Sequence, residues 1–192
     1  MSFVPVPMQK WIEPEQVSHV LGQAKTLRDK ALLAVVYQLG LRRSEVRRIL
    51  RSDYDGSHVE FTRSKAPWRP GVLKVKLWPR TKTLLDAYLA TRHDSKGWLF
   101  MTRVKKAMSG QMVYLIYRDA ARAVGLSHVH CNPHTLRHSI AAHLARAGLD
   151  IVEIQKFMGH TSPAGTVAYM AGARNPIYDM DLAGSSHHVA AW

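Results

Sequence analysis

The sequence is poor in cysteine and has no long apolar run. Cys131 is the single cysteine among 192 residues, so an intrachain disulfide is impossible and a reducing compartment is the simplest setting. No stretch approaches the roughly 18 apolar residues that a membrane span needs. Two prolines within the first ten residues argue against a secretory leader. These absences favour a soluble, cytoplasmic protein without a membrane partner.

Acidic residues are also scarce. The chain has 14 acidic side chains against 27 basic ones, which gives a formal net charge of +13. The basic residues recur from Arg28 to Arg174 instead of filling one arm, as is typical of a folded surface that binds a polyanion. Nucleic acid is the first candidate for that polyanion, and an anionic membrane is the alternative. The length fits one compact domain.

Hydrophobic periodicity predicts a mainly α fold with a small antiparallel β-sheet, in the α+β class. An alternating pattern in residues 58–78 predicts a β-hairpin around a turn at residues 66–71. Residues 98–100 are a further strand candidate. Apolar residues at helical spacing predict helices over residues 13–24, 27–39, 80–91, 109–124 and 135–147.

Capping residues predict three shorter helices. Ser44 is expected to cap one that buries Val46, Ile49 and Leu50. Asp150 is expected to begin a second helix, which Gly159 ends. Ser162, followed by a proline, predicts the start of a third helix that carries Tyr169.

Phosphodiester transfer without a metal needs three kinds of group. Cations must bind the non-bridging oxygens, a nucleophile must stand in line with the leaving oxygen, and an acid must protonate that oxygen. Arginine suits the first task, because its planar guanidinium offers several donors and stays charged at neutral pH.

Four short segments place such groups in a specific order. They are Gly40-Leu41-Arg42-Arg43-Ser44-Glu45, His134-Thr135-Leu136-Arg137-His138, Gly159-His160, and Tyr169 nine residues later. Each segment alone is common, but the ordered set resembles the tyrosine recombinase (phage integrase) family over roughly residues 11–171. The length is similar to that of the short fimbrial phase-variation invertases, which lack the usual N-terminal DNA-clamping domain.

The resemblance implies a tyrosine recombinase catalytic-domain fold and an enzyme that cuts and rejoins DNA without metal, ATP or another cofactor. The covalent intermediate would be a 3′-phosphotyrosyl bond. The implied catalytic residues are Arg42, Arg137 and His160 on the scissile phosphate, Tyr169 as nucleophile, Lys65 as the acid for the 5′-oxygen, and His134 as proton acceptor, with Glu45 orienting the site.

Two assignments have competitors within the sequence. Arg43 competes with Arg42, but the Gly-Leu-Arg-x-Ser-Glu pattern selects Arg42. Lys74 and Lys76 compete with Lys65, because the hairpin turn is longer than is common in the family. The candidates for contacts with DNA phosphates outside the catalytic set are Arg43, Arg69, Lys74 and Lys76.

A run of histidines raises the question of a zinc site. His128, His130, Cys131, His134 and His138 are residue types that zinc prefers. The Glu of a His-Glu-x-x-His pattern is missing, however, and an arginine inside the run would repel a dication. We therefore expect no metal, and a small semi-buried thiol at Cys131.

The leading functional hypothesis is a site-specific recombinase acting in integration, excision or inversion. A type IB topoisomerase-like enzyme and a non-catalytic DNA-binding regulator are the alternatives, and the complete catalytic set argues against the regulator. The expected partners are double-stranded DNA, three further copies in a synaptic homotetramer and an accessory DNA-bending protein, which implies association with the nucleoid. We expect a catalytic domain over residues 1–172 and a tail over 173–192 that docks on a neighbour through Trp192.

Overall fold

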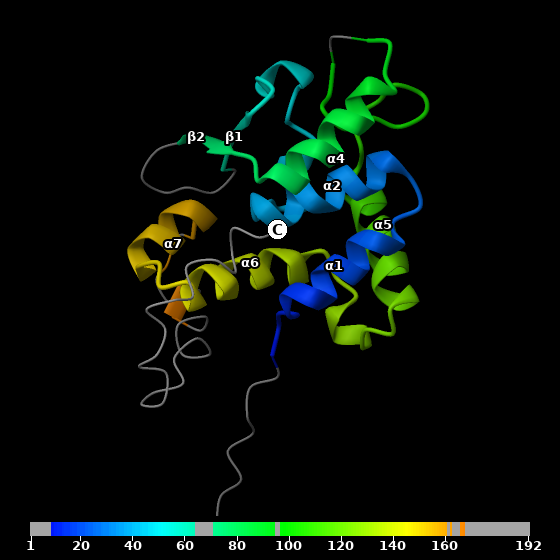
Figure 1. Ribbon diagram of the computed structural model, residues 1–192. Helices are drawn as coiled ribbons and strands as arrows, with labels where there is room; N and C mark the ends of the chain where they lie inside the picture. Colours follow the sequence, from blue (N-terminus) through cyan, green and yellow to red (C-terminus); the bar gives the residue numbers. More distant parts are fainter. Residues whose placement is uncertain (1–8, 64–70, 95–96, 161, 163–165, 168–192) are drawn as a thin grey trace, which may run out of the picture.

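The computed structural model describes residues 9–63, 71–94, 97–160, 162 and 166–167. The prediction of a mainly helical fold with one small antiparallel sheet is confirmed (Figure 1). The elements are α1 (Pro14–Gln23), α2 (Leu27–Gln38), α3 (Arg43–Val46), η1 (Arg51–Asp53), β1 (His58–Thr62), β2 (Val72–Lys76), α4 (Pro79–Ala90), α5 (Gly110–Ala123), η2 (His128–His130), α6 (His134–Arg146) and α7 (Ile151–Met158).

Helix α2 runs through the middle of the core. All of its residues from Ala31 to Gln38 are buried, which is the pattern of a helix that is covered on every side. Helices α1, α4 and α6 pack against it (Figure 1). The segment that follows α2, beginning with Gly40, therefore starts inside the molecule, and it is this segment that carries Arg42.

The predicted β-hairpin is confirmed. Val59 pairs with Val75 and Phe61 pairs with Leu73 in an antiparallel register. Val59 and Phe61 are buried, whereas Lys74 is exposed on the opposite face, as the alternation predicts. Most of the predicted turn, residues 66–70, lies outside the described residues.

The predicted cap of the third helix is wrong. Helix α3 spans only Arg43–Val46, and Arg42 instead of Ser44 occupies its N-cap position. The Glu45 carboxylate accepts the backbone N–H of the N-cap residue Arg42 at 2.8 Å, which is the N3-to-N-cap bond of a capping box. Ile49 and Leu50 both lie beyond the helix end; Ile49 is buried as predicted, whereas Leu50 is 39% exposed.

The strand predicted at residues 98–100 is not formed. Trp98 makes only an isolated antiparallel bridge with Leu50, and the Leu99 backbone N–H donates to the Ile49 carbonyl at 2.8 Å. The segment pairs with the chain after α3 over too few residues to continue as a strand.

The predicted helix boundaries in the last third are confirmed where the structure describes them. Asp150 accepts the Val152 N–H at 2.7 Å and so caps α7. Gly159 ends α7 in the left-handed region with φ of 60°. Thr166 and Val167 are helical, while Tyr169 and the predicted tail over residues 173–192 lie outside the described residues.

The Cys131 thiol is more deeply buried than the semi-buried position predicted for it. It is 6% exposed, and its sulfur lies 3.5 Å from the Ser127 carbonyl and 3.6 Å from the Leu126 carbonyl.

Within the described ranges, no helix has the length and apolar character required to cross a bilayer.

His143 in α6 joins the two core helices α2 and α6. Its Nδ1 shares a hydrogen bond of 2.7 Å with the Tyr37 hydroxyl, and the residue is only 4% exposed. Burial lowers the pKa of His143 to about 4, and nearby Arg146 acts in the same direction while Glu13 opposes it. The imidazole is therefore neutral in the folded protein at pH 7.

We expect this histidine to make the fold sensitive to acid. The pKa of His143 is lower in the folded protein than in the unfolded chain, so the unfolded chain binds the proton more tightly. The stability that neutral His143 contributes is therefore complete above about pH 6.5 and is lost as the pH falls towards 4. That loss should approach about 3 kcal/mol. Urea unfolding from pH 7 to pH 4 measures it, with His143→Gln as the comparison. Equal pH dependence in the two proteins would contradict the assignment.

Candidate active site

Three arginines converge on the C-terminal end of α7. Three consecutive backbone carbonyls at this end each accept a hydrogen bond from a different guanidinium, two of them at 2.8 and 2.9 Å. A helix C-terminus carries partial negative charge on its unpaired carbonyls, so cations stabilise it. The donors to Phe157, Met158 and Gly159 are, in that order, Arg63, Arg137 and Arg42.

Two of these arginines also bind the turn that follows α2. The Gly40 carbonyl accepts from Arg63 Nη1 at 2.9 Å and from Arg137 Nη1. Gly40 has φ of 55°, and a Cβ there would lie 3.1 Å from the sulfur of Met158, so glycine is required by both conformation and space. The ends of α2 and α7 are thus tied together by charged donors.

A buried carboxylate completes the cluster. Glu45 is 1% exposed. Its Oε1 accepts from Arg42 Nη1 at 3.0 Å, and its Oε2 accepts from Arg63 Nη1 at 3.0 Å as well as from the Arg42 backbone N–H. Such complete pairing offsets the cost of burying the charge. Glu45 therefore fixes the orientation of Arg42, whose side chain remains 19% exposed.

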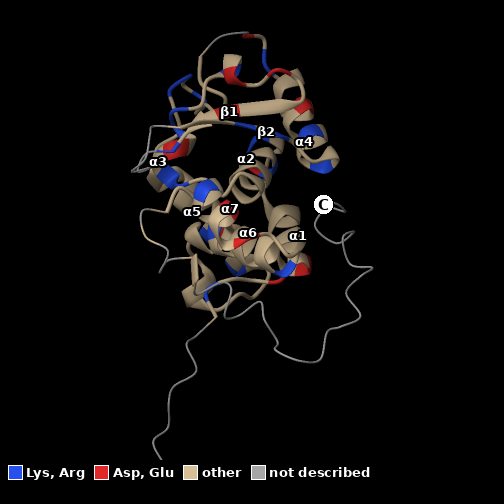
Figure 2. Cartoon of the chain, turned by 90° about the vertical axis from the view of Figure 1, so that its left-hand side faces the viewer, with Lys and Arg blue, Asp and Glu red and all other residues tan. Residues whose placement is uncertain are grey.

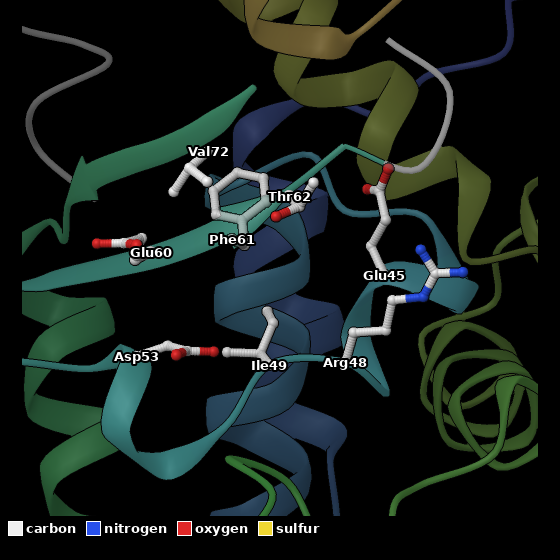
Figure 3. A pocket seen from close by; sticks show the side chains of 8 residues that line it. All are labelled: Glu45, Arg48, Ile49, Asp53, Glu60, Phe61, Thr62 and Val72. Atoms are coloured by element: carbon white, nitrogen blue, oxygen red, sulfur yellow. The ribbon is translucent and has the colours of Figure 1, made fainter. Parts of the chain in front are cut away.

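Figure 3 shows Glu45 among the side chains that line a pocket beside β1. Glu45 stands at the edge of this pocket, which has a volume of about 160 Å³. Its carboxylate points towards the end of β1, away from Asp53 and Ile49. The pocket is lined by Glu45, Arg48, Ile49, Asp53, Glu60, Phe61, Thr62 and Val72.

His160 directly follows the α7 terminus. Its Nδ1 shares a hydrogen bond of 2.9 Å with the hydroxyl of buried Thr166. Burial lowers the pKa of His160 to about 4, and the charges of Arg137, Arg42 and Arg63 lower it further. The ring is therefore neutral at pH 7. When the Thr166 hydroxyl donates to Nδ1, the ring proton resides on Nε2, which can then act as a donor.

His134 begins α6 and faces an open cleft. The cleft has a volume of about 570 Å³. Burial lowers the pKa of His134, with Arg43 and Arg137 adding to the effect, so a neutral imidazole is available to accept a proton. Figure 2 shows lysines and arginines in blue, several of them on and beside α3. The cleft is lined by Arg42, Arg43, Ser44, Arg47, Gly110, Gln111 and His134.

Comparison with known proteins decides the family. A model described as the phage integrase family matches residues 10–175 of the chain. The chain belongs to this family. The tyrosine recombinase XerA of Pyrococcus horikoshii is 33% identical over 173 residues, which cover 86% of this chain and 58% of that protein. The tyrosine recombinase XerD of Neisseria meningitidis is 30% identical over 167 residues, covering 82% and 57%.

Solved structures of the family share the fold. A crystal structure of XerA recombinase superposes with a TM-score of 0.74 at 23% identity, over 91% of this chain and 61% of that one. A lambda integrase dimer bound to a COC′ core site gives a TM-score of 0.65 at 16% identity, over 88% and 49%. The chain spans little more than half the length of the curated relatives that it matches. These relatives favour the recombinase hypothesis over the topoisomerase and regulator alternatives.

The structure brings together four of the residues that the family resemblance singled out. Arg42, Glu45 and Arg137 meet at the C-terminal end of α7, and His160 follows directly. His134 lines the same cleft as Arg42. Their catalytic roles remain predictions.

Of the other predicted site residues, two lysines of the hairpin stand apart from this cluster and Arg43 lies beside Arg42. Lys74 makes an ion pair with Asp55 at 2.9 Å on the exposed face of the hairpin, and Lys76 is exposed on that face. Arg43 lines the cleft beside Arg42, as expected of a phosphate-facing neighbour. The remaining three, Lys65, Arg69 and Tyr169, lie outside the described residues.

The histidine run of the sequence does not assemble into a ligand set. In the part of the chain that the structure describes, no three His, Cys, Asp or Glu side chains are grouped so that they could hold a metal ion. His134 and His138 do lie one turn apart on α6, with ring centroids 6.5 Å apart.

Sequence reasoning missed Arg63. A signal for it was present, because Val59, Phe61 and Arg63 are alternate residues and all three are buried. An arginine on the inward-facing register of a strand must find partners in the interior. That register could have identified Arg63 as a residue of the site.

Proposed function

We propose that this chain provides the catalytic part of a site-specific DNA recombinase, which cleaves and rejoins strands through a 3′-phosphotyrosyl intermediate. The observation that carries the proposal is the convergence of Arg42, Arg137 and His160 at one helix end. Donors fixed in a partly buried site stabilise developing negative charge without reorganising, which makes them effective on a transition-state phosphorane.

We infer the following roles in the reaction, of which the described geometry supports those of Arg42, Arg137 and His160 together with that of His134. Arg42 and Arg137 bind the non-bridging oxygens of the scissile phosphate, and His160 donates from Nε2. Tyr169 attacks phosphorus as its proton passes to His134, whose lowered pKa leaves it neutral and able to accept. The bond from phosphorus to the 5′-oxygen breaks, and Lys65 protonates that oxygen. A 5′-hydroxyl from a partner strand reverses the step, because the phosphotyrosyl bond retains the energy of the phosphodiester.

The proposal extends to the assembly. One lambda integrase structure is a tetramer bound to a Holliday junction, and a XerH structure is a post-cleavage complex with a palindromic difH substrate. We infer that this chain acts on double-stranded DNA as a homotetramer in the synaptic complex, with an accessory DNA-bending protein and in association with the nucleoid. Integration, excision and inversion are all compatible with this chemistry.

Covalent capture of DNA tests the proposed function. The purified chain is incubated with sheared DNA from its source organism in EDTA, denatured in detergent, and the protein-linked ends are sequenced. We expect linked 3′ ends that resist a 3′-exonuclease beside free 5′-hydroxyl ends, enriched at one sequence. Tight DNA binding without any linked end, with or without Mg²⁺, would contradict the enzyme and favour a non-catalytic regulator.

A further inference from the structure

We propose that Arg63 is a positioning residue for strand cleavage, which fixes Glu45 and, through it, Arg42 against the segment that carries His160. The proposal rests on the function proposed above, because it concerns the rate of that reaction. It assigns a role to a side chain that does not itself reach the DNA.

The hydrogen bonds of Arg63 explain why it acts through other residues. Its guanidinium donates to the Leu39 carbonyl at 2.7 Å, the Phe157 carbonyl at 2.8 Å, the Gly40 carbonyl at 2.9 Å and Glu45 Oε2 at 3.0 Å. The residue is 2% exposed. A guanidinium has five N–H donors, so most of them are directed into the protein and the group is covered from solvent.

The contact with Glu45 transmits this position to Arg42. Each carboxylate oxygen of Glu45 binds a different arginine side chain, Oε1 that of Arg42 and Oε2 that of Arg63. Without Arg63, Oε2 would lose a charged donor and keep the neutral backbone N–H of Arg42. The carboxylate could then rotate, and the guanidinium of Arg42 would lose its fixed direction.

The stem of Arg63 supports the segment before His160. A Cβ at Gly159 would lie 3.0 to 3.2 Å from the Cβ, Cγ and Cδ atoms of Arg63, so the stem packs directly on this glycine. The guanidinium also lies over the rings of Phe61 at 4.7 Å and Phe157 at 5.4 Å. Arg63 therefore touches both the segment that orients Arg42 and the turn that leads into His160.

Lysine cannot reproduce this arrangement. A planar fork can reach three carbonyls and a carboxylate in different directions at once, whereas an ammonium is a point charge at the end of a flexible chain. Arg63→Lys keeps the positive charge beside Glu45 but loses the planar guanidinium, so it distinguishes the effect of the hydrogen-bond geometry from that of the charge. Arg63→Met removes both.

Arg92 offers a matched control elsewhere in the described chain. Its side chain is 7% exposed, it pairs with Asp94, and its Nη1 donates to the carbonyls of Trp98 and Leu99 at 2.8 Å each. It is thus a covered arginine that binds carbonyls and a carboxylate, but none of these partners belongs to the candidate active site. Arg92→Lys should affect stability alone.

The first test compares rates on the DNA sequence captured by the wild-type protein. Single-turnover formation of the covalent adduct at saturating DNA, DNA affinity and urea unfolding are measured for wild type, Arg63→Lys and Arg92→Lys. We expect Arg63→Lys to form the adduct about 10²-fold more slowly with nearly unchanged affinity, because small misplacements of reacting groups carry costs of that order. Equal rate losses in both variants, or none in Arg63→Lys, would overturn the proposal.

A second test does not depend on activity. The ring resonances of His160 are followed by NMR through a pH titration in the same three proteins and in Arg63→Met. We expect them to move in both Arg63 variants and to stay in place in Arg92→Lys. Unchanged His160 resonances in a folded Arg63 variant would overturn the positioning role. If wild type captures no DNA, the proposed function fails, and these spectra still decide whether Arg63 positions His160.

Discussion

The Tyr169→Phe protein is expected to form no covalent adduct with DNA while binding DNA as tightly as the wild type. Phenylalanine lacks the oxygen that would attack phosphorus, yet keeps the size and apolar character of the ring. Tyr169 is chosen because it follows the Gly159-His160 pair by nine residues, the spacing in the family's motif.

Tyr114→Phe and Tyr178→Phe are the matched controls for this substitution. Tyr114 lies on α5, and neither residue has a Gly-His pair nine positions before it in the sequence. Both controls should retain wild-type adduct formation in the covalent-capture assay. If the Tyr169→Phe protein formed an adduct, or if only one of the control proteins failed to form one, the nucleophile would be a residue other than Tyr169.

Local sequence patterns predicted the ends of helices where the capping group belongs to the capping residue itself. Ser109 accepts the N–H of Met112 and begins α5, and Asp150 and Gly159 bound α7. Ser44 failed as a cap for a reason that lies outside its neighbourhood. Glu45 is held by the side chain of Arg63, and its carboxylate accepts the backbone N–H of Arg42, so the helix begins two residues earlier than a Ser44 cap requires.

The candidate site shows the same limit of sequence reasoning. The order of Arg42, Arg137 and His160 identified the family's motif, but a motif does not say what holds those side chains. The carbonyls that accept from Arg137 belong to Gly40 and Met158, which come from two different helix ends. Only the packing of α2, α6 and α7 brings these groups together, and spacing in the sequence carries no record of that packing.

Arg42→Ala is expected to slow covalent capture by about 10²–10³-fold, the usual cost of losing one fixed donor to a transition-state oxyanion. It should also destabilise the fold by about 1–3 kcal/mol, because the buried Oε1 of Glu45 loses the guanidinium that it accepts from. The Gly159 carbonyl loses its donor as well. Single-turnover capture and urea unfolding measure the two effects separately.

Arg43→Ala provides the decisive comparison, because Arg43 is adjacent in sequence and lines the same cleft. If Arg43 contacts a phosphate outside the reacting centre, its loss should weaken DNA binding and reduce the slope of log affinity against log salt by about 1, while the capture rate at saturating DNA stays unchanged. A slower rate in Arg43→Ala and a normal rate in Arg42→Ala would reverse the two roles. We expect the slower rate in Arg42→Ala, because the contacts of Arg42 with Glu45 and Gly159 hold its guanidinium in one orientation.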